Sequence, residues 1–262
     1  MADKPKSFEE FYFSIKDDVF DIDVVADYAD LHEGNIGEFD GNMFCPECEE
    51  AKLSFVHQTS KRRAHLRRNS SSKHKDGCSY NYDYASRKKV QGYVNSLSYG
   101  EIQDKLNAIM NMLCKDHKKK SSESDTKDDS PIKAQNPMLI HETTNNGDVL
   151  KALRRKRLNA WIDESDGNDL CVFYGKVKLK IEEKEKIDKS SKDSYKYNLL
   201  KIYTQNKKGE WKFRTSLYRG VIKDIINENA IYNIVMIGHL YFKFKPFTIE
   251  LANKNALKYR EI

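Results

Sequence analysis

The stretch from Phe44 to Tyr80 reads FCPECEEAKLSFVHQTSKRRAHLRRNSSSKHKDGCSY, and it decides how the N-terminal part of the chain folds. Cys45 and Cys48 form a C-x2-C knuckle, whose two-residue gap lets both thiolates point at one cation. His74 and Cys78 follow as an H-x3-C pair, which adds an imidazole and a third thiolate. Three thiolates and one imidazole are the tetrahedral ligand set that Zn²⁺ prefers, so the stretch predicts a zinc site.

Other assignments of these residues stay open at the level of sequence. His65 or His57 can take the place of His74 as the nitrogen ligand. A disulfide framework requires an oxidising compartment, whereas the polar first residues carry no signal peptide. We therefore expect a cytoplasmic protein with reduced cysteines. The two remaining cysteines, Cys114 and Cys171, lie on apolar faces and are expected in the core.

The same stretch resembles the N-terminal zinc-binding region of CoiA-like competence proteins. The resemblance rests on FCPEC, the basic segment HLRR at His65–Arg68, and SKHKDGC at Ser72–Cys78, and it covers about residues 20–90. Such regions typically show a CPxC knuckle, an aromatic HFxH-type segment and a later H-x3-C. Arg68 stands where the second histidine of that segment falls, which leaves the metal ligands uncertain if the family uses it. The nuclease domain that follows in competence proteins has no recognisable counterpart here.

Charge is unevenly distributed along the 262 residues. The whole chain has a net charge of +6, but residues 1–50 hold fifteen acidic residues against three lysines, a net of −12. An acidic segment of this kind suits a basic protein partner, and the basic remainder suits a polyanion. No apolar run approaches the ~18–20 residues that span a bilayer.

The apolar spacing divides the chain into two domains joined by a linker. Helical patterns over 22–32 and 86–115, with a capping box formed by Ser98 and Glu101, surround the zinc stretch. Together they predict a small zinc-ribbon-like α+β domain over 8–115. Residues 116–148 have clustered charge and almost no apolar pattern, which predicts a flexible linker.

Beyond the linker, the apolar period changes from helical to alternating, and we expect a barrel domain over 149–262. Strands are predicted at 170–181, 198–205, 210–217, 231–244 and 247–251, with a helix over 221–229. Three strands, a helix and two strands are the order of an OB-fold, a five-stranded barrel. The chain is therefore predicted to be α+β, with a zinc-ribbon-like domain followed by an OB-like barrel.

Cations and aromatic residues are interleaved in the barrel and clustered near the zinc stretch. On the first barrel strand Lys176, Lys178 and Lys180 share one face, and Val177 and Leu179 face the core. Barrels that bind single strands combine such cations with aromatic rings on which bases stack. The candidate nucleic-acid contacts are Arg62, Arg63, Arg67, Arg68, Arg154, Arg155, Arg157, Lys176, Lys178, Trp211, Lys212 and Arg214.

Enzymatic signatures are weak by comparison. The chain has no nucleophile elbow, P-loop or dinucleotide fingerprint. Asp169, Glu182 and Lys184 faintly imitate a metal-dependent nuclease, a match that chance produces in a chain this rich in charge. We therefore expect a non-catalytic, zinc-containing protein that binds DNA or RNA and prefers single strands or structured ends. The alternative is an adaptor that uses the acidic segment and the barrel to dock other proteins.

Overall fold

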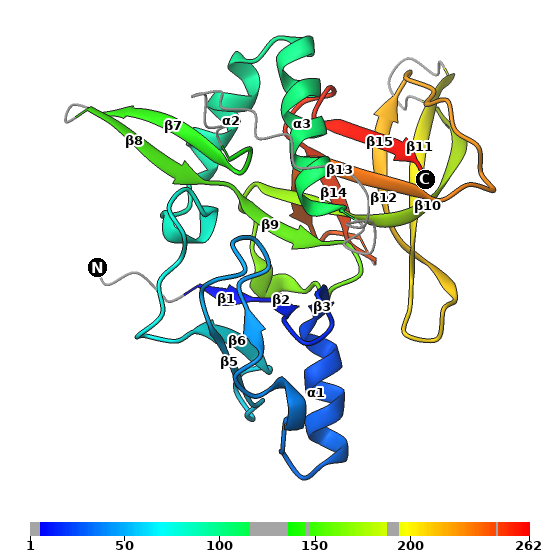
Figure 1. Cartoon of the computed structure of the whole chain (residues 1–262). Coiled ribbons are helices and arrows are strands. Elements are labelled where there is room, and N and C mark those ends of the chain that lie inside the picture. Colours follow the sequence, from blue (N-terminus) through cyan, green and yellow to red (C-terminus); the bar gives the residue numbers. More distant parts are fainter. Residues whose placement is uncertain (1–5, 116–135, 145–146, 188–193, 245) are drawn as a thin grey trace, which may run out of the picture. The chain divides into compact units, whose positions relative to one another are not determined.

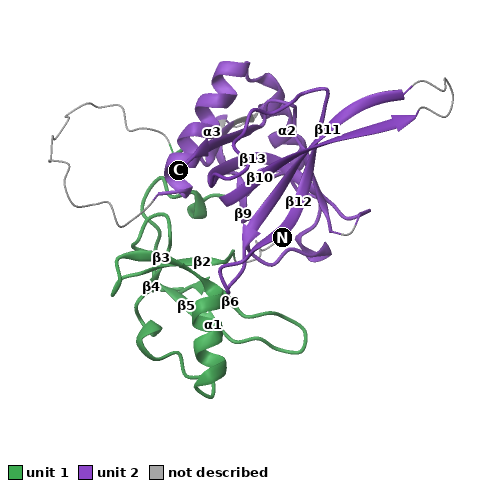
Figure 2. Ribbon diagram, turned by 90° about the vertical axis from the view of Figure 1, so that its right-hand side faces the viewer, with its two compact units in different colours: residues 1–83, 116–136 green, residues 84–115, 137–262 purple. Residues whose placement is uncertain are grey.

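The computed structural model describes residues 6–115, 136–144, 147–187, 194–244 and 246–262 (Figure 1). The chain forms two compact units, each assembled from two segments (Figure 2). Unit 1 consists of residues 1–83 and 116–136, and unit 2 consists of residues 84–115 and 137–262. None of the helices in these described ranges is long and apolar enough to cross a membrane.

In its described residues, unit 1 contains two small antiparallel sheets and one α-helix. One sheet has the order β3-β2-β4 and the other β1-β6-β5. Phenylalanines fill the core because alternate residues of β2 point inward and meet Phe39. The elements are β1 (Ser7–Phe8), β2 (Glu10–Phe13), β3 (Asp18–Asp21), α1 (Ile22–Leu31), β4 (Met43–Phe44), β5 (Leu53–Val56) and β6 (His65–Arg68).

Two helices begin unit 2, α2 (Arg87–Ser96) and α3 (Tyr99–Leu113). Ser98 caps α3: its hydroxyl accepts the Glu101 N–H at 3.3 Å, and the Glu101 carboxylate accepts the Ser98 N–H at 2.8 Å. This capping box was predicted from the sequence.

The partners of these helices differ from the sequence-based expectation. Val94, Leu106 and other apolar residues of α2 and α3 share one core with Val172 and Val235 of the barrel sheet. The boundary expected at residue 115 is therefore replaced by boundaries near residues 83 and 137. An apolar helix face is visible in a sequence, but the surface that covers it is not.

The C-terminal end of the predicted linker over 116–148 instead forms strands. Residues 116–135 lie outside the described residues, whereas β7 (Leu139–Thr144) and β8 (Gly147–Ala152) pair as an antiparallel hairpin. The hairpin is joined to the rest of unit 2 by a parallel bridge between Tyr84 and Ala152 and by a hydrogen bond from Ala85 N to Ala152 O of 2.9 Å.

The main sheet of unit 2 is antiparallel, except for one parallel edge pair, and is nearly closed. Its order is β12-β11-β10-β13-β14, with β15 paired to β13 and β9 parallel to β10. β12 lies against β14, and the Thr215 hydroxyl donates to the carbonyl of Phe247 at 2.9 Å. The strands are β9 (Arg154–Arg157), β10 (Cys171–Ile187), β11 (Ser194–Gln205), β12 (Trp211–Gly220), β13 (Tyr232–Tyr241), β14 (Thr248–Leu251) and β15 (Leu257–Glu261).

Strand β10 belongs to both halves of this sheet. Residues 171–177 pair with β13, and residues 178–187 pair with β11. The strand bends at Gly175, whose φ of +148° disfavours other residues and whose Cα faces Leu158. Phe173, Val177 and Leu179 fill the interior with apolar residues of the neighbouring strands. The predicted strands and the inward side of β10 are thus confirmed.

The helix predicted over 221–229 is absent, and the segment between β12 and β13 is irregular. Asp224 forms a buried, bidentate ion pair with Arg219, at 2.8 and 3.1 Å. Asn227 N–H donates to the Tyr232 hydroxyl at 2.7 Å. These two anchors hold the segment in its irregular conformation, and Ile225 is left 92% exposed. The helical spacing of its apolar residues was therefore misleading.

Candidate metal centre and nucleic-acid interface

The four predicted ligands converge in unit 1. One possible ligand atom from each of Cys45, Cys48, His74 and Cys78 lies within 4.8 Å of all the others. The Cys45 and Cys78 sulfurs are 3.9 Å apart, and His74 Nδ1 lies 3.5 Å from the sulfurs of Cys48 and Cys78. Tetrahedral zinc with standard bond lengths requires about 3.8 Å between sulfurs and about 3.6 Å between sulfur and nitrogen. The cluster can therefore hold a metal ion of this size.

The knuckle geometry follows from a tight turn between β4 and β5. Cys45 N–H donates to the carbonyl of Ala51 at 2.8 Å, and Glu49 N–H donates to the carbonyl of Cys45 at 2.9 Å. Glu49 adopts a φ of +57°, which reverses the chain immediately after Cys48. The turn thereby presents both knuckle sulfurs on one side.

The environment of the thiols explains why they need a cation. Burial raises the pKa of Cys45 to about 12, and a hydrogen bond with Cys45 raises the pKa of Cys78. Hydrogen bonds from these two thiols lower the pKa of Cys48. The three sulfurs therefore differ in how readily they ionise, and Cys48 loses its proton most easily. A divalent cation supplies the positive charge that allows all three sulfurs to ionise.

Neighbouring groups fix the loop that carries the second ligand pair. The His74 ring lies beside the packed rings of Phe8 and Tyr80: its centroid is 6.0 Å from that of Phe8 and 5.9 Å from that of Tyr80, and those two are 4.3 Å apart. Glu47 accepts the Ser79 hydroxyl at 2.6 Å, directly after the last ligand. The ligand orientation is therefore built into the packing of unit 1.

The alternative histidines lie elsewhere. His65 Nδ1 is 3.1 Å from the carbonyl oxygen of Arg63, and the His57 ring packs edge-on against Phe55 at 4.9 Å. Neither joins the ligand group found among the described residues, so the structure selects His74.

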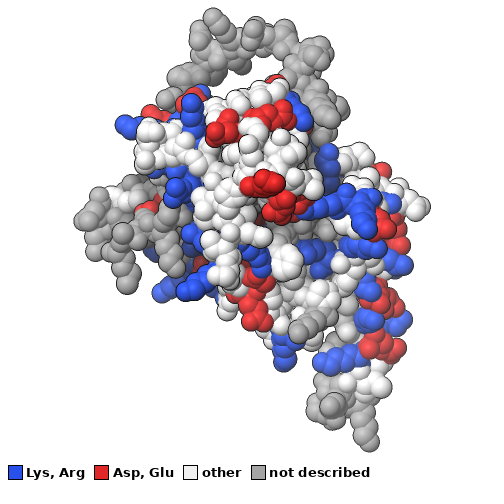
Figure 3. Space-filling model, turned by 90° about the horizontal axis from the view of Figure 1, so that it is seen from below, with Lys and Arg blue, Asp and Glu red and all other residues white. Residues whose placement is uncertain are grey.

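The predicted cations of unit 1 are on the surface. Arg62, Arg63, Arg67 and Arg68 are all exposed. Arg68 also donates to the carbonyls of Asn69 and Ser72, in the loop that leads to His74. In the view of Figure 3, basic and acidic side chains are interspersed over the visible face.

A second arrangement, in unit 2, lies on the outer side of β10, β11 and β12. The register pairs Lys178 with Tyr203 and Lys184 with Tyr197, and alternate residues of β11 are buried. The side chains between them point outward. We call this surface the strand face; it consists of Lys178, Lys180, Glu182, Lys184, Lys186, Tyr195, Tyr197, Leu199, Lys201, Tyr203, Trp211, Phe213, Ser216 and Tyr218.

The rings of the strand face form two groups. The first aromatic cluster is Tyr203, Phe213 and Trp211: the Tyr203 and Phe213 centroids are 5.6 Å apart, and Tyr203 and Trp211 line one shallow depression with Lys178. Lys178 Nζ lies 5.6 Å from the Trp211 ring centre, and Lys201 Nζ lies 5.7 Å from that of Phe213. Cations and rings therefore share one surface.

The second aromatic cluster is Tyr195, Tyr197 and Tyr218. The Tyr197 and Tyr218 centroids are 5.5 Å apart, and those of Tyr195 and Tyr197 are 6.3 Å apart. Tyr218 is 64% exposed, so its ring is available to a ligand.

The other predicted contacts of unit 2 do not all reach the strand face. Lys176 and Lys212 are exposed, and Lys212 is 3.2 Å from Glu210. Arg214 instead donates to the carbonyl of Leu158 at 2.6 Å and to that of Ala160, and burial lowers its pKa. Arg214 therefore holds the segment after β9 in place.

The three predicted arginines of β9 are half-buried beside the first half of β10. Arg154 pairs with Asp169 at 3.2 Å and lies 4.4 Å from the Tyr84 ring centre. Arg155 and Arg157 occupy the same strand, away from the part of β10 that pairs with β11. The sequence pattern identified Trp211 and Lys178 as contacts but not how the rings group into two clusters, because only the register shows which rings share a face.

The nuclease-like residues do not come together. Asp169 precedes the 17-residue strand β10, whereas Glu182 lies toward its far end. Glu182 binds Lys184 at 2.9 Å and Lys201 at 2.8 Å, as one acid among the lysines of the strand face. A strand advances about 3.3 Å per residue, so the two carboxylates are too far apart to share a metal ion.

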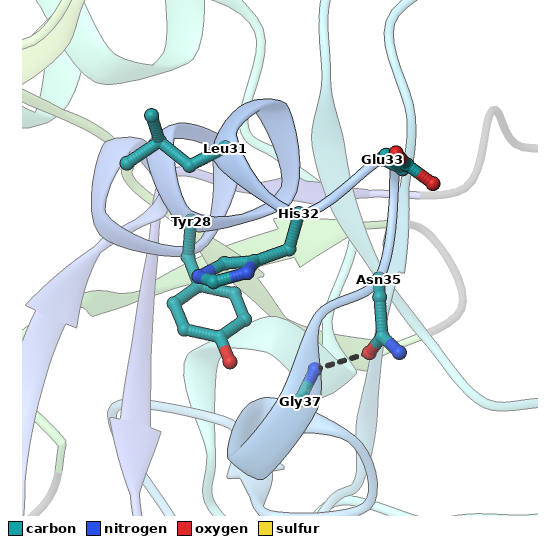
Figure 4. Close-up of a pocket in the computed structure, with 6 residues that line it drawn as sticks. All are labelled: Tyr28, Leu31, His32, Glu33, Asn35 and Gly37. Carbon is teal, nitrogen blue, oxygen red and sulfur yellow. Dashed lines mark hydrogen bonds between the residues drawn. The ribbon is translucent and has the colours of Figure 1, made fainter.

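A depression of about 390 Å³ lies at the C-terminal end of α1 (Figure 4). The His32 and Tyr28 rings are 4.1 Å apart on one side of it, and Asn35 accepts the Gly37 N–H at 2.7 Å on the other. The lining side chains contain no paired nucleophile and base, which argues for a packing feature.

Comparison with known proteins found no matching family, no matching curated protein and no matching solved structure. The resemblance of the zinc stretch to CoiA-like proteins therefore rests on the quoted residues alone. Function has to be argued from the metal centre and the strand face.

Proposed function

We propose that this chain is a non-catalytic nucleic-acid-binding protein, in which the strand face contacts the nucleic acid. The observation that carries the proposal is the mixture on that face of six aromatic rings with the lysines of β10 and β11. Aromatic rings that bases can stack on, next to lysines that phosphates can contact, are how proteins hold single strands.

The topology supports an OB-like barrel as the scaffold. The bent first strand β10 pairs with both β11 and β13, and β12 meets β14 to close the sheet. OB barrels bind oligonucleotides on their second and third strands, which correspond here to β11 and β12. The helix usual between the third and fourth strands is replaced by the anchored segment around Asp224.

We propose that the metal of unit 1 is Zn²⁺ with a structural role. All four coordination positions of a tetrahedral ion are taken by protein ligands, which leaves none open for a substrate. Bound metal orders the loops of unit 1 and with them the exposed Arg62, Arg63, Arg67 and Arg68, which are suited to phosphate contacts.

Salt dependence of binding tests the proposal. The full chain is titrated with fluorescent oligothymidylate at increasing KCl, and the logarithm of affinity is plotted against that of salt. Each phosphate contact on a single strand contributes about 0.7 to the slope. Replacing Lys180 and Lys184 with glutamine is expected to reduce the slope by about 1.4. The matched control is the double variant Lys88→Gln, Lys89→Gln, at exposed positions of α2. This variant should leave the salt slope unchanged.

The second candidate is a protein adaptor, and one observation favours it. Val221 is 89% exposed and Ile225 is 92% exposed. Both lie on the segment that follows Tyr218 of the second aromatic cluster in the chain. Exposed apolar residues of this kind suit a protein partner. Absence of any oligonucleotide binding at low salt, together with loss of a protein partner in Ile225→Ser, would establish the adaptor instead.

A further inference from the structure

The two aromatic clusters are separated along the strand face, and this spacing bears on the length of the ligand. Tyr203 and Tyr197 both belong to β11 and point outward. At about 3.3 Å per residue, the strand places them about 20 Å apart. The outward residues between them on β11 are Leu199, which pairs with Tyr218 of the second aromatic cluster, and Lys201, which pairs with Ser216. Only the Lys201–Ser216 pair therefore carries no aromatic ring, and four residues of β11, about 13 Å, separate Tyr203 from the Leu199–Tyr218 pair.

From this spacing we infer that the strand face is a track for single-stranded nucleic acid with a base-stacking station at each end. The inference rests on the proposed function. A strand stacked at about 3.4 Å per nucleotide needs about six nucleotides to cover 20 Å, and a more extended backbone needs fewer. The complete track then occupies about five to eight nucleotides, within the range of about 4–16 known for OB-like barrels.

The charges along the track suit a phosphate backbone between the two stations. Lys178, Lys180, Lys184 and Lys186 follow one another on the outer side of β10. The acid among them, Glu182, is neutralised by Lys184 at 2.9 Å and Lys201 at 2.8 Å. With Lys201, the strand face therefore carries five lysines against Glu182, and Glu228 borders the depression lined by Lys178, Tyr203 and Trp211.

Exposed rings favour single strands over duplexes. Tyr218 is 64% exposed, Tyr195 is 44% exposed and Phe213 is 42% exposed. A base can stack on such a ring only when it has left its own stack, as in an unpaired strand. Bases in a duplex are already paired and stacked. Both DNA and RNA single strands offer the required bases and phosphates.

Affinity measured against oligonucleotide length tests the track. Fluorescence anisotropy of the full chain is recorded with oligothymidylates of 4, 6, 8, 12 and 16 nucleotides, and with matching oligouridylates to compare DNA with RNA. Affinity is expected to rise by roughly tenfold to a hundredfold between 4 and 8 nucleotides, because a second stacking contact becomes possible. Beyond 8 nucleotides it should rise only weakly. Unlabelled duplex of equal length should not displace the strand.

Variants at the two ends distinguish a track from a single site. Tyr203→Ala with Phe213→Ala removes one station, and Tyr197→Ala with Tyr218→Ala removes the other. Each double variant is expected to lower the affinity for the 12-mer by roughly tenfold to a hundredfold. The affinity for the 4-mer should fall by only about a factor of two. Tyr99→Ala, an exposed tyrosine on α3, is the control. The single change Tyr218→Ala, at an exposed ring, gives the same comparison should a double variant fold poorly.

The results that overturn the track differ from those that overturn the function. Equal affinity of the unchanged chain for the 4-mer and the 12-mer refutes two stations, although nucleic-acid binding itself survives. Two stations are also refuted if either one can be removed without lowering the affinity for the 12-mer. Displacement by duplex refutes the preference for single strands. Failure to bind any oligonucleotide at low salt refutes the proposed function itself.

Discussion

Replacing one metal ligand should unfold unit 1 and leave unit 2 intact. Cys48→Ser removes one of four ligands from a cluster whose members Cys45 and Cys78 are 0% and 4% exposed and form part of the unit 1 core. Structural zinc contributes about 10–16 kcal/mol of apparent binding free energy. A whole domain is stable by only about 5–15 kcal/mol. Loss of the metal can therefore exceed the total stability of unit 1.

The assay combines metal analysis with hydrogen exchange. The unchanged chain should contain one zinc per molecule, and Cys48→Ser should contain much less. Amides in residues 43–80 should then exchange as in an unfolded chain. Amides in β10 should keep their protection, since the apolar residues that pack around β10 include no metal ligand.

Cys114→Ser is the matched control, because Cys114 is a cysteine outside the ligand cluster. It should retain full zinc content and full protection of residues 43–80. The reasoning fails if Cys48→Ser still binds one zinc per chain, or if it loses the metal while residues 43–80 remain protected.

Three further changes test the packing of each unit. Asp224→Asn should lower the free energy of unfolding by about 3–5 kcal/mol in urea denaturation, because Arg219 then keeps a buried, unpaired charge. A decrease below about 1 kcal/mol would contradict this. Gly37→Ala should lower the free energy of unfolding by at least about 1–2 kcal/mol. The φ of residue 37 is +51°, and the new Cβ would lie 2.5 Å from the Tyr28 hydroxyl. An unchanged melting temperature would refute the contact. Burial lowers the pKa of Lys105 to about 8. The unfolded chain then binds more protons than the folded chain between about pH 8 and 10.4, so the free energy of unfolding should rise over that window. Lys105→Met should abolish the rise, and a rise of the same size in the variant would exclude this lysine as its source.

Sequence spacing was sufficient to predict those features that depend only on residues close together in the chain. The metal ligands were identified because a knuckle and an H-x3-C pair each act within one turn of chain. The outward side of β10 was identified because its apolar residues alternate. The start of α3 was identified because Ser98 and Glu101 are three residues apart.

Features that depend on distant partners could not be predicted in this way. The segment 221–229 has helical apolar spacing, but the buried ion pair of Asp224 with Arg219 anchors it in an irregular conformation. Helices α2 and α3 show which residues they bury but not that strands β10 and β13 bury them. The tyrosines of β11 become a ligand-binding candidate only when the register places β12 beside them.

The order of the elements along the chain has a consequence for biosynthesis. All residues of the metal cluster have been made by Cys78, so the cluster can assemble early during translation. Helices α2 and α3 are made next, but Gln103 of α3 binds the carbonyls of Asn255 and Leu257, near the C-terminus. Their apolar faces stay uncovered until nearly the whole chain has left the ribosome. A chain cut short before β13 would therefore expose these helices and be prone to aggregation or chaperone capture.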